Sequence, residues 1–417
     1  ADKSLLRASA ADADRFTMLE TIREFALEKL EEAGEAEEIR RSHAHYFRKL
    51  AEEAEAQLIG EEQREWLDRL EIEHDNLRAT LTWSLENAPL IASHVANGLW
   101  RFWHIRGHIN EGHQWADRVL RETELTSAER LRVLSAAASF AEIQGDPRGS
   151  IVYAEEALSL ARKLRDDAGV ARALIDLSTA WLQLGYLDLA ASSIEEALTL
   201  AQLGVDDHLL VRALNNAANV RSEQSREDEA ISLYREGARI AEAASDKRGV
   251  MMALLGLGEI AAFAGSRPES KTALNRVLAI SRQLGDSFFE AGALINLGIV
   301  DLLENQNVAA VRRFQQALIM GSGLRSTYLI VSSLDGLAAA LIDEDLKKAA
   351  HFLATSDDLR ASAGLPRSSA EQSFYQPRID VLKHQLTHEQ QAEVLRERLT
   401  LEDAILAVQA AASAALE

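Results

Sequence analysis

The feature that most constrains this chain is a sequence pattern that returns every forty residues. One column of the pattern is always leucine, and the position four residues later always holds a small side chain. The leucine column is Leu134, Leu174, Leu214, Leu254, Leu294 and Leu334, and the small column is Ala138, Ser178, Ala218, Gly258, Gly298 and Ala338. Self-similarity at a fixed period of this length indicates an array of like structural units.

Each unit of the pattern contains two windows of helical periodicity. In the second unit the windows run from Val170 to Leu184 and from Leu187 to Leu203. The position between the windows is predicted to adopt the left-handed conformation that ends a helix, which suits Gly best and then Asn or Asp. It is occupied by Gly145, Gly185, Ser225, Gly265, Asn305 and Asp345. The pattern therefore predicts helix, tight turn and helix, six times over residues 130–369.

The composition agrees with an all-α protein. Ala, Leu and Glu dominate, and sustained runs of β-branched residues are almost absent. A two-helix unit cannot bury both of its faces alone, so the units are expected to stack.

The second unit, "ALIDLSTAWLQLGYLDLAASSIEEALTLA", resembles a tetratricopeptide repeat. The resemblance implies a right-handed superhelix of helix-turn-helix units with helical N- and C-terminal caps. It also implies that the first helix of each pair lines the concave side.

The flanking segments resemble one region of a particular class of regulators. "RFTMLETIREFALEKL" and "EHDNLRA" resemble the segments that precede the repeat array in bacterial signal-transduction ATPases of the STAND class, found in AfsR-like, LuxR-type and MalT-like transcriptional regulators. In that class a nucleotide-binding module and a winged helix come first. The resemblance implies a winged-helix hairpin remnant at 1–18, with strands at Ser4–Arg7 and Arg15–Met18. It further implies a helical linker or N-terminal cap at 19–89, a divergent first repeat at 90–129, six repeats at 130–369 and C-terminal capping helices at 370–417.

Four aromatic residues of the divergent repeat are expected to belong to the core at the end of the stack. They are Trp100, Phe102, Trp103 and Trp115. An aromatic cage around a ligand is the less favoured interpretation.

Charge and composition exclude several classes of function. The 45 basic and 66 acidic residues give a formal net charge of −21, which opposes binding to nucleic acid by this region. The absence of Cys excludes disulfides and thiol chemistry. The sequence has no long apolar run, so we expect no membrane association and a cytoplasmic location.

No pattern of residues predicts catalysis. The string "GSRPESKT" from Gly265 to Thr272 resembles a phosphate-binding loop but has Ser270 in place of the second glycine, and it lies at a repeat turn. His104 and His108 are four residues apart, but Gly107 interrupts their helix. We therefore predict neither an enzyme nor a cofactor or metal site.

The candidate binding residues are those that the tetratricopeptide resemblance places on the concave groove. They are Arg172, Asp176, Thr179, Arg212, Asn215, Asn216, Asn219, Glu223, Glu259 and Asn296. Three asparagines within five residues are unfavourable in a helix interior, by roughly 1.5–2 kcal/mol relative to Ala. A carboxamide donates and accepts hydrogen bonds at once, so it suits the backbone of a peptide or a polar small molecule. The alternative is that these asparagines are only solvated in a wet groove.

The expected function is that of the sensor or interaction region of a STAND-type regulatory ATPase. Its expected partners are an inducer, either a peptide or a small molecule, or a partner protein in the groove, together with the ATPase and winged-helix modules of the parent protein. The alternative function is a constitutive protein-binding scaffold without a sensory ligand.

Overall fold

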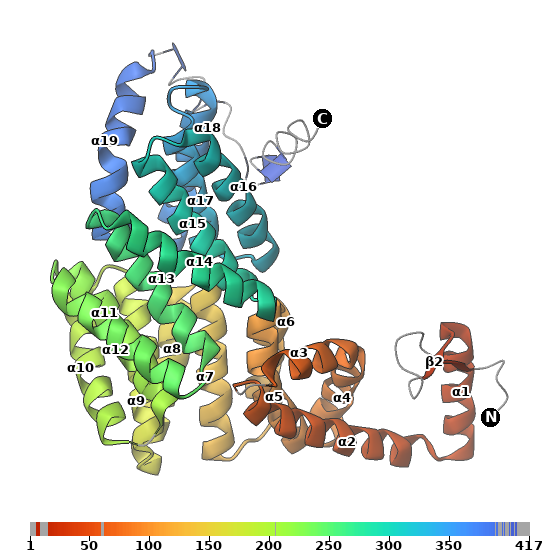
Figure 1. Ribbon diagram of the computed structural model, residues 1–417. Coiled ribbons are helices and arrows are strands. Elements are labelled where there is room, and N and C mark those ends of the chain that lie inside the picture. Colours follow the sequence, from red (N-terminus) through yellow and green to blue (C-terminus); the bar gives the residue numbers. More distant parts are fainter. Residues whose placement is uncertain are drawn as a thin grey trace.

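The computed structural model contains a small hairpin followed by helices (Figure 1). It describes residues 6–8, 16–59, 62–204 and 206–387, together with 389–390, 394, 396, 400, 402–403 and 405–406. Strands β1 (Leu6–Ala8) and β2 (Phe16–Met18) pair antiparallel. The helices before the repeats are α1 (Glu20–Ala33), α2 (Ala36–Gln57), α3 (Gln63–Ile72), α4 (His74–Asn87), α5 (Pro89–Arg106) and α6 (Ile109–Glu122).

The following helices fall where the forty-residue pattern predicts them. They are α7 (Ser127–Gln144), α8 (Pro147–Leu164), α9 (Asp167–Gln183), α10 (Leu187–Leu203), α11 (Asp207–Glu223), α12 (Glu227–Ala243), α13 (Lys247–Phe263), α14 (Arg267–Leu284), α15 (Ser287–Leu303), α16 (Asn307–Leu324), α17 (Thr327–Ala340) and α18 (Leu346–Ala363), with α19 (Ser369–Gln385) after them. The predicted all-α superhelix of tetratricopeptide type is confirmed.

Five of the six predicted turn residues adopt the left-handed conformation. Their φ angles are 75° at Gly145, 78° at Gly185, 57° at Ser225, 84° at Gly265 and 58° at Asn305.

The prediction for Asp345 is wrong. Its φ is −145°, and its carboxylate accepts a hydrogen bond from the backbone N–H of Lys348 at the start of α18. Helix α17 ends early, at Ala340, so a longer connection replaces the tight turn and needs no left-handed residue at this point.

Small residues of the repeat mark close helix crossings. A Cβ atom built on Gly258 would lie 2.6 Å from Leu274 Cγ, and one on Gly298 would lie 2.7 Å from Phe314 Cζ. These distances are far below van der Waals contact, so only glycine permits the observed approach. Ser270 occupies the matching column in the second helix, where its buried hydroxyl donates to the carbonyl of Gly258.

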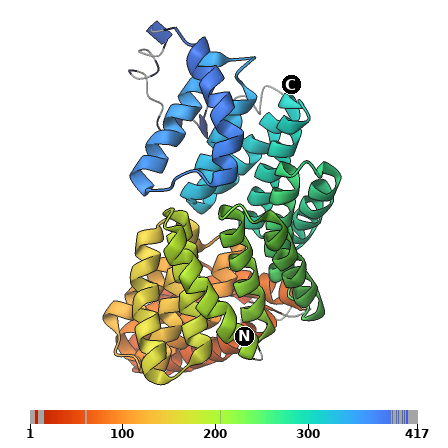
Figure 2. The ribbon, with the colours of Figure 1, turned by 90° about the vertical axis from the view of Figure 1, so that its left-hand side faces the viewer.

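The array winds until its last helices meet its first (Figure 2). Figure 2 shows the blue C-terminal helices ending directly above the yellow and green helices of the early repeats. Gly107 after α5 approaches Leu324, and Gly145 after α7 approaches Thr327. The backbone N–H of Ser369 donates to the carboxylate of Glu223 at 3.0 Å, across 146 residues of sequence. The concave side is therefore enclosed.

The flanks agree in part with the sequence-based expectations. In the hairpin Leu6 pairs with Met18, while Ser4, Leu5 and Arg15 lie outside the described residues. Helix α1 packs on α2 and stands apart from the repeats (Figure 1). The division into a winged-helix remnant, caps and repeats stays a prediction. None of the described helices is long and apolar enough to cross a bilayer.

The four aromatic residues predicted for the core lie on α5 and α6. Phe102 and Trp103 are buried in the core, as predicted. Trp115 is half-buried against the core. Trp100 is likewise half-buried against the core, and it also lines the enclosed concave side.

Candidate functional site

The enclosed side of the superhelix contains three adjoining cavities. Their volumes are about 230, 290 and 320 Å³, and we call them the first, middle and last cavity. Neighbouring cavities share wall residues, and the three cavities together are called the central channel below. The first and middle cavities share Trp100, Ser139 and Arg212, and the middle and last cavities share Glu142, Ile143, Asn219, Tyr234, Glu259, Phe288 and Tyr328.

The first helices of the pairs supply much of the channel wall, as the tetratricopeptide resemblance implied. On α11, Arg212, Asn215 and Asn219 follow one another at helical spacing and all line the middle cavity. Residues three and four apart lie on one face of a helix, so a single face of α11 presents them together.

The channel has a basic region in which two arginines are paired with buried carboxylates. Arg212 donates to Asp176 at 2.7 Å, and Arg248 donates to Asp286 at 3.2 Å. Burial raises the pKa of Asp176, and the charge of Arg212 opposes that rise. Asp176 is buried and does not line the three cavities, so it supports Arg212 from behind the channel wall.

Two further arginines of this basic region, Arg101 and Arg172, lack an ion pair within the described part of the chain. Burial lowers the pKa of Arg101 to about 10, and the charge of Arg248 adds to that effect. The guanidinium of Arg101 lies over the ring of Trp100, at 4.4 Å from its centroid. Burial and then the charge of Arg212 lower the pKa of Arg172. The two free guanidinium groups thus add positive charge that no carboxylate offsets by direct contact.

His104 is held neutral beside these arginines. Its pKa lies well below the usual value because of burial and the nearby charges of Arg248 and Arg101. Arg248 donates to its Nε2, which leaves its Nδ1 buried without a partner.

Towards the last cavity, the channel wall carries two carboxyl groups, Glu142 and Glu259, which we call the acidic half of the channel. Burial raises the pKa of Glu142 and the pKa of Glu259 to about 7. The negative charge of Asp176 adds to the rise in the pKa of Glu142, whereas the charges of Arg212 and Arg248 oppose it. The charges of Glu371 and Glu223 add to the rise in the pKa of Glu259. Neither Glu142 nor Glu259 makes an ion pair among the described residues.

The three asparagines of α11 have different environments. Asn216 donates to the hydroxyl of Thr179 at 2.5 Å and accepts from the hydroxyl of Ser178 at 2.7 Å, so it is a structural link between α9 and α11. Asn219 accepts a hydrogen bond from the hydroxyl of Tyr234.

Asn215 is the exception among these asparagines. It is 3% exposed, lines the middle cavity, and has no hydrogen-bond partner at either Oδ1 or Nδ2. Native proteins rarely leave a buried carboxamide unsatisfied. Asn216 is similarly buried, at 4% exposed, but its carboxamide is hydrogen-bonded at both Oδ1 and Nδ2.

The remaining predicted residues lie at different depths. Thr179 and Glu223 line the last cavity, where Glu223 also accepts the N–H of Ser369. Glu259 lines both the middle and last cavities. Asn296 is buried within α15 and is not among the residues that line the three cavities. Seven of the ten predicted residues therefore line the channel, and Asp176 and Asn216 support it through hydrogen bonds to Arg212 and Thr179. Asn296 lies apart from it.

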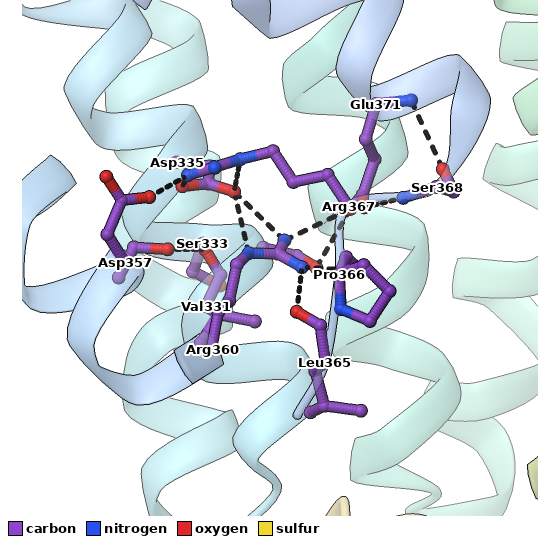
Figure 3. A network of polar contacts seen from close by, with 12 residues as sticks. Val331, Ser333, Asp335, Asp357, Arg360, Leu365, Pro366, Arg367, Ser368 and Glu371 are labelled. Carbon is purple, nitrogen blue, oxygen red and sulfur yellow. Dashed lines mark hydrogen bonds and ion pairs between the residues drawn. The ribbon is translucent and has the colours of Figure 1, made fainter. Parts of the chain in front are cut away.

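A buried ion-pair network fixes the C-terminal wall of the channel (Figure 3). The carboxylate of Asp335 accepts from Arg360 at 2.9 Å and from Arg367 at 2.7 Å. Glu371 lies 3.5 Å from Arg360 and also accepts the N–H of Ser368. These contacts hold the segment between α18 and α19, which lines the last cavity.

Several wall residues are not among the ten predicted binding residues. They are Trp100, Arg101 and His104 on α5, Arg248 on α13 and Tyr328 on α17. Helix α5 precedes the regular repeats, so no column of the pattern assigns its inward face. The arginine column Arg132, Arg172 and Arg212 is a signal in the sequence that points to the basic region.

The comparisons with known proteins agree with this fold. No family model matches the chain. Proteins of Mycobacterium bovis and Mycobacterium tuberculosis named "Putative HTH-type transcriptional regulator" are 35% identical over 184 residues, which is 42% of this chain and 21% of theirs. The chain thus spans about a fifth of the length of the curated relatives it matches.

Two solved structures are also similar. The Rap conjugation gene regulator of the plasmid pLS20, in complex with the Phr* peptide, aligns with a TM-score of 0.56 and 12% identity, covering 76% of this chain and 96% of that one. A STAND protein of Pyrococcus horikoshii with a tetratricopeptide repeat sensor aligns at 0.45 and 14% identity, covering 97% and 58%. The curated relatives confirm the predicted resemblance to transcriptional regulators, and the Rap structure confirms the fold.

Proposed function

We propose that this chain is the sensor region of a STAND-type regulatory ATPase, and that it binds an inducer in the central channel. The inducer is a peptide or a small molecule that carries amide-like groups. The observation that carries the proposal is the carboxamide of Asn215, which is buried in the channel wall without a partner.

The energetics of Asn215 favour an occupant. A buried polar group without a partner destabilises a protein by about 1–3 kcal/mol. A carboxamide presents a donor and an acceptor side by side, and the peptide group of a ligand satisfies both. The volumes of the middle and last cavities, about 290 and 320 Å³, suit a ligand of this kind.

The comparisons support a regulatory role. The sequence relatives are named as transcriptional regulators, and the Rap regulator with the same fold binds a peptide. In the parent protein, the partners of this region would be the ATPase and winged-helix modules. With a net charge of −21, this region contributes no nucleic-acid binding of its own.

The direct test is to identify what the channel holds. Native mass spectrometry of the purified chain, followed by affinity selection from cell extract, identifies bound small molecules and peptides. Asn215→Ala is expected to lower retention of the ligand by roughly 5- to 150-fold, the equivalent of about 1–3 kcal/mol. The matched control is Asn275→Ala, an exposed asparagine inside α14. Equal retention by both variants and the wild type would show that the channel is not the site.

A constitutive scaffold is the second candidate, because tetratricopeptide arrays also hold partner proteins. The two candidates differ in the full-length parent protein. A sensor changes the ATPase activity of the parent when the ligand is added, whereas a scaffold binds its partner and leaves that activity unchanged.

A further inference from the structure

We infer that the occupant of the central channel is a short peptide with two charged ends, held with its carboxylate against Arg101 and Arg172 and its amino group against Glu142 and Glu259. This inference rests on the proposed function and adds the chemical class and the direction of the ligand.

The basic region is built for an anion that the chain itself does not supply. Arg212 and Arg248 have carboxylate partners, but Arg101 and Arg172 have none among the described residues. The carboxylate whose charge most favours ionised Arg101 is that of Asp246, and it is already committed to the N–H of Gly249 and to His208 at 2.9 Å.

Repulsion among the arginines makes this region unfavourable when empty. The charges of Arg248, Arg172 and Arg212 all oppose the charge of Arg101. Guanidinium groups bind carboxylates through paired, charge-assisted hydrogen bonds. An incoming carboxylate therefore relieves the repulsion and gains hydrogen bonds at the same point.

The acidic half of the channel has the opposite requirement. Glu142 and Glu259 are free of ion pairs among the described residues, and Glu371 and Glu223 oppose the ionisation of Glu259. The other carboxylates of this region are committed, Glu223 to the N–H of Ser369 and Glu371 to Arg360 and the N–H of Ser368. An ammonium group placed here neutralises charge that the protein leaves exposed to the channel.

The arginines of the last cavity do not compensate these carboxyl groups. Arg360 and Arg367 both point to Asp335, as Figure 3 shows, and Asp335 is 2% exposed. Their charge is therefore already satisfied inside the wall.

The cavities fix the order of these groups along the channel. Arg172 lines only the first cavity, Arg101 and Asn215 line only the middle one, and Glu142 and Glu259 line the middle and the last. The unsatisfied carboxamide of Asn215 thus lies in the cavity where the basic and acidic groups meet. A peptide matches this order, with a charged group at each end and amide groups between them.

The test uses a library of random pentapeptides without charged side chains, prepared in four forms. In the first form both ends are free. The second form is acetylated at the amino end, the third is amidated at the carboxyl end, and the fourth is blocked at both ends. The full chain is incubated with each form, and the retained peptides are quantified by mass spectrometry. The free form is expected to be retained at least about tenfold better than either singly blocked form, because each blocking step removes a charge-assisted contact.

Two variants locate the ends. In Arg172→Gln the preference for a free carboxylate is expected to fall while the preference for a free amino group remains. In Glu259→Gln the reverse is expected. The matched controls are Arg239→Gln and Glu236→Gln, both exposed on α12 and outside the three cavities. Thermal melting confirms that every variant is folded.

The outcomes separate this inference from the proposed function. Equal retention of all four forms would leave peptide binding in place and overturn the polarity. A polarity that the two channel variants do not change would place the charged contacts elsewhere and would also overturn the inference. Inorganic phosphate is added as a competitor, and its effect is compared with that of the pentapeptides acetylated at the amino end, which keep a carboxylate. If phosphate displaces the bound peptides equally well, the basic region is a general anion site and the inference is overturned. Retention of no form would overturn the peptide class, while the extract-based test with Asn215→Ala still decides whether the channel binds a ligand.

Discussion

The clearest test of the electrostatics inside the channel is Glu259→Gln in the absence of any ligand. Burial raises the pKa of Glu259 from 4.5 to about 7, whereas the unfolded chain restores the lower value. Between these two values the folded protein holds a proton that the unfolded chain has lost. The free energy of unfolding therefore falls as the pH rises from about 4.5 to about 7, and it stays lower above that range.

The size of the effect follows from the same shift. A difference of about 2.5 pKa units corresponds to about 3 kcal/mol at full ionisation, and about 2 kcal/mol of that develops between pH 5.5 and pH 8. Water in the channel screens the carboxylate and reduces both figures. Glutamine keeps the shape of the side chain and cannot ionise, so Glu259→Gln is expected to be more stable than the wild type, and by a wider margin at pH 8.

The assay is urea unfolding of both proteins at pH 5.5 and pH 8, followed by far-ultraviolet circular dichroism. The exposed control Glu236→Gln is expected to differ from the wild type by the same amount at both pH values. A margin for Glu259→Gln that is equal at both pH values, or larger at pH 5.5, would refute the assignment of a raised pKa and the view of an uncompensated acidic half.

Three further predictions concern packing and polar contacts. Gly298→Leu is expected to lower the free energy of unfolding by roughly 1–3 kcal/mol or more, measured by thermal melting, because a Cβ there already meets Phe314 at 2.7 Å; an unchanged melting curve would contradict the register. Asn216→Ala is expected to lower the free energy of unfolding by about 1–3 kcal/mol, measured by urea unfolding, because the protein loses two short hydrogen bonds. Asn215→Ala, which removes a carboxamide without partners, is expected to be neutral or stabilising. Equal effects of the two substitutions would contradict the different environments of the two residues. Asp335→Ala is expected to destabilise by about 3–5 kcal/mol because two arginines lose their buried carboxylate, and a change below 1 kcal/mol would contradict the role of the network.

Much of the local structure was predictable because it depends on residues close together in sequence. Helical periodicity, the small residues at crossings and the glycines at turns are all properties of a single forty-residue unit. Ser225, the weakest match at the turn position, still adopts a φ of 57° because the same turn is imposed by helices on both sides of it. The left-handed conformation predicted for Asp345 is wrong because α17 ends early, so the flanking helices no longer impose a tight turn there.

The environment of the binding residues was not predictable in the same way. The tetratricopeptide resemblance placed Asn215, Asn216 and Asn219 together on the concave face, but it did not distinguish the free carboxamide from the two bonded ones. That distinction depends on Ser178 and Thr179 one repeat earlier and on Tyr234 in the second helix of the pair. It also depends on the enclosure of the concave side, which results from small rotations between units summed over the whole array.

The contacts between the first and last helices also change how the array responds as a unit. An open solenoid has two free ends, and its stability is close to a sum over neighbouring repeats, so it unravels from either end. Here Gly107 meets Leu324, Gly145 meets Thr327 and Glu223 binds Ser369, so the terminal units have neighbours on both sides. These distant contacts form only after the intervening repeats are folded, which makes folding slower and more cooperative than in an open array. A ligand that enters or leaves between the first and last helices must break those contacts. The exchange rate of the ligand and the rate at which the array ends open therefore depend on the same free-energy barrier.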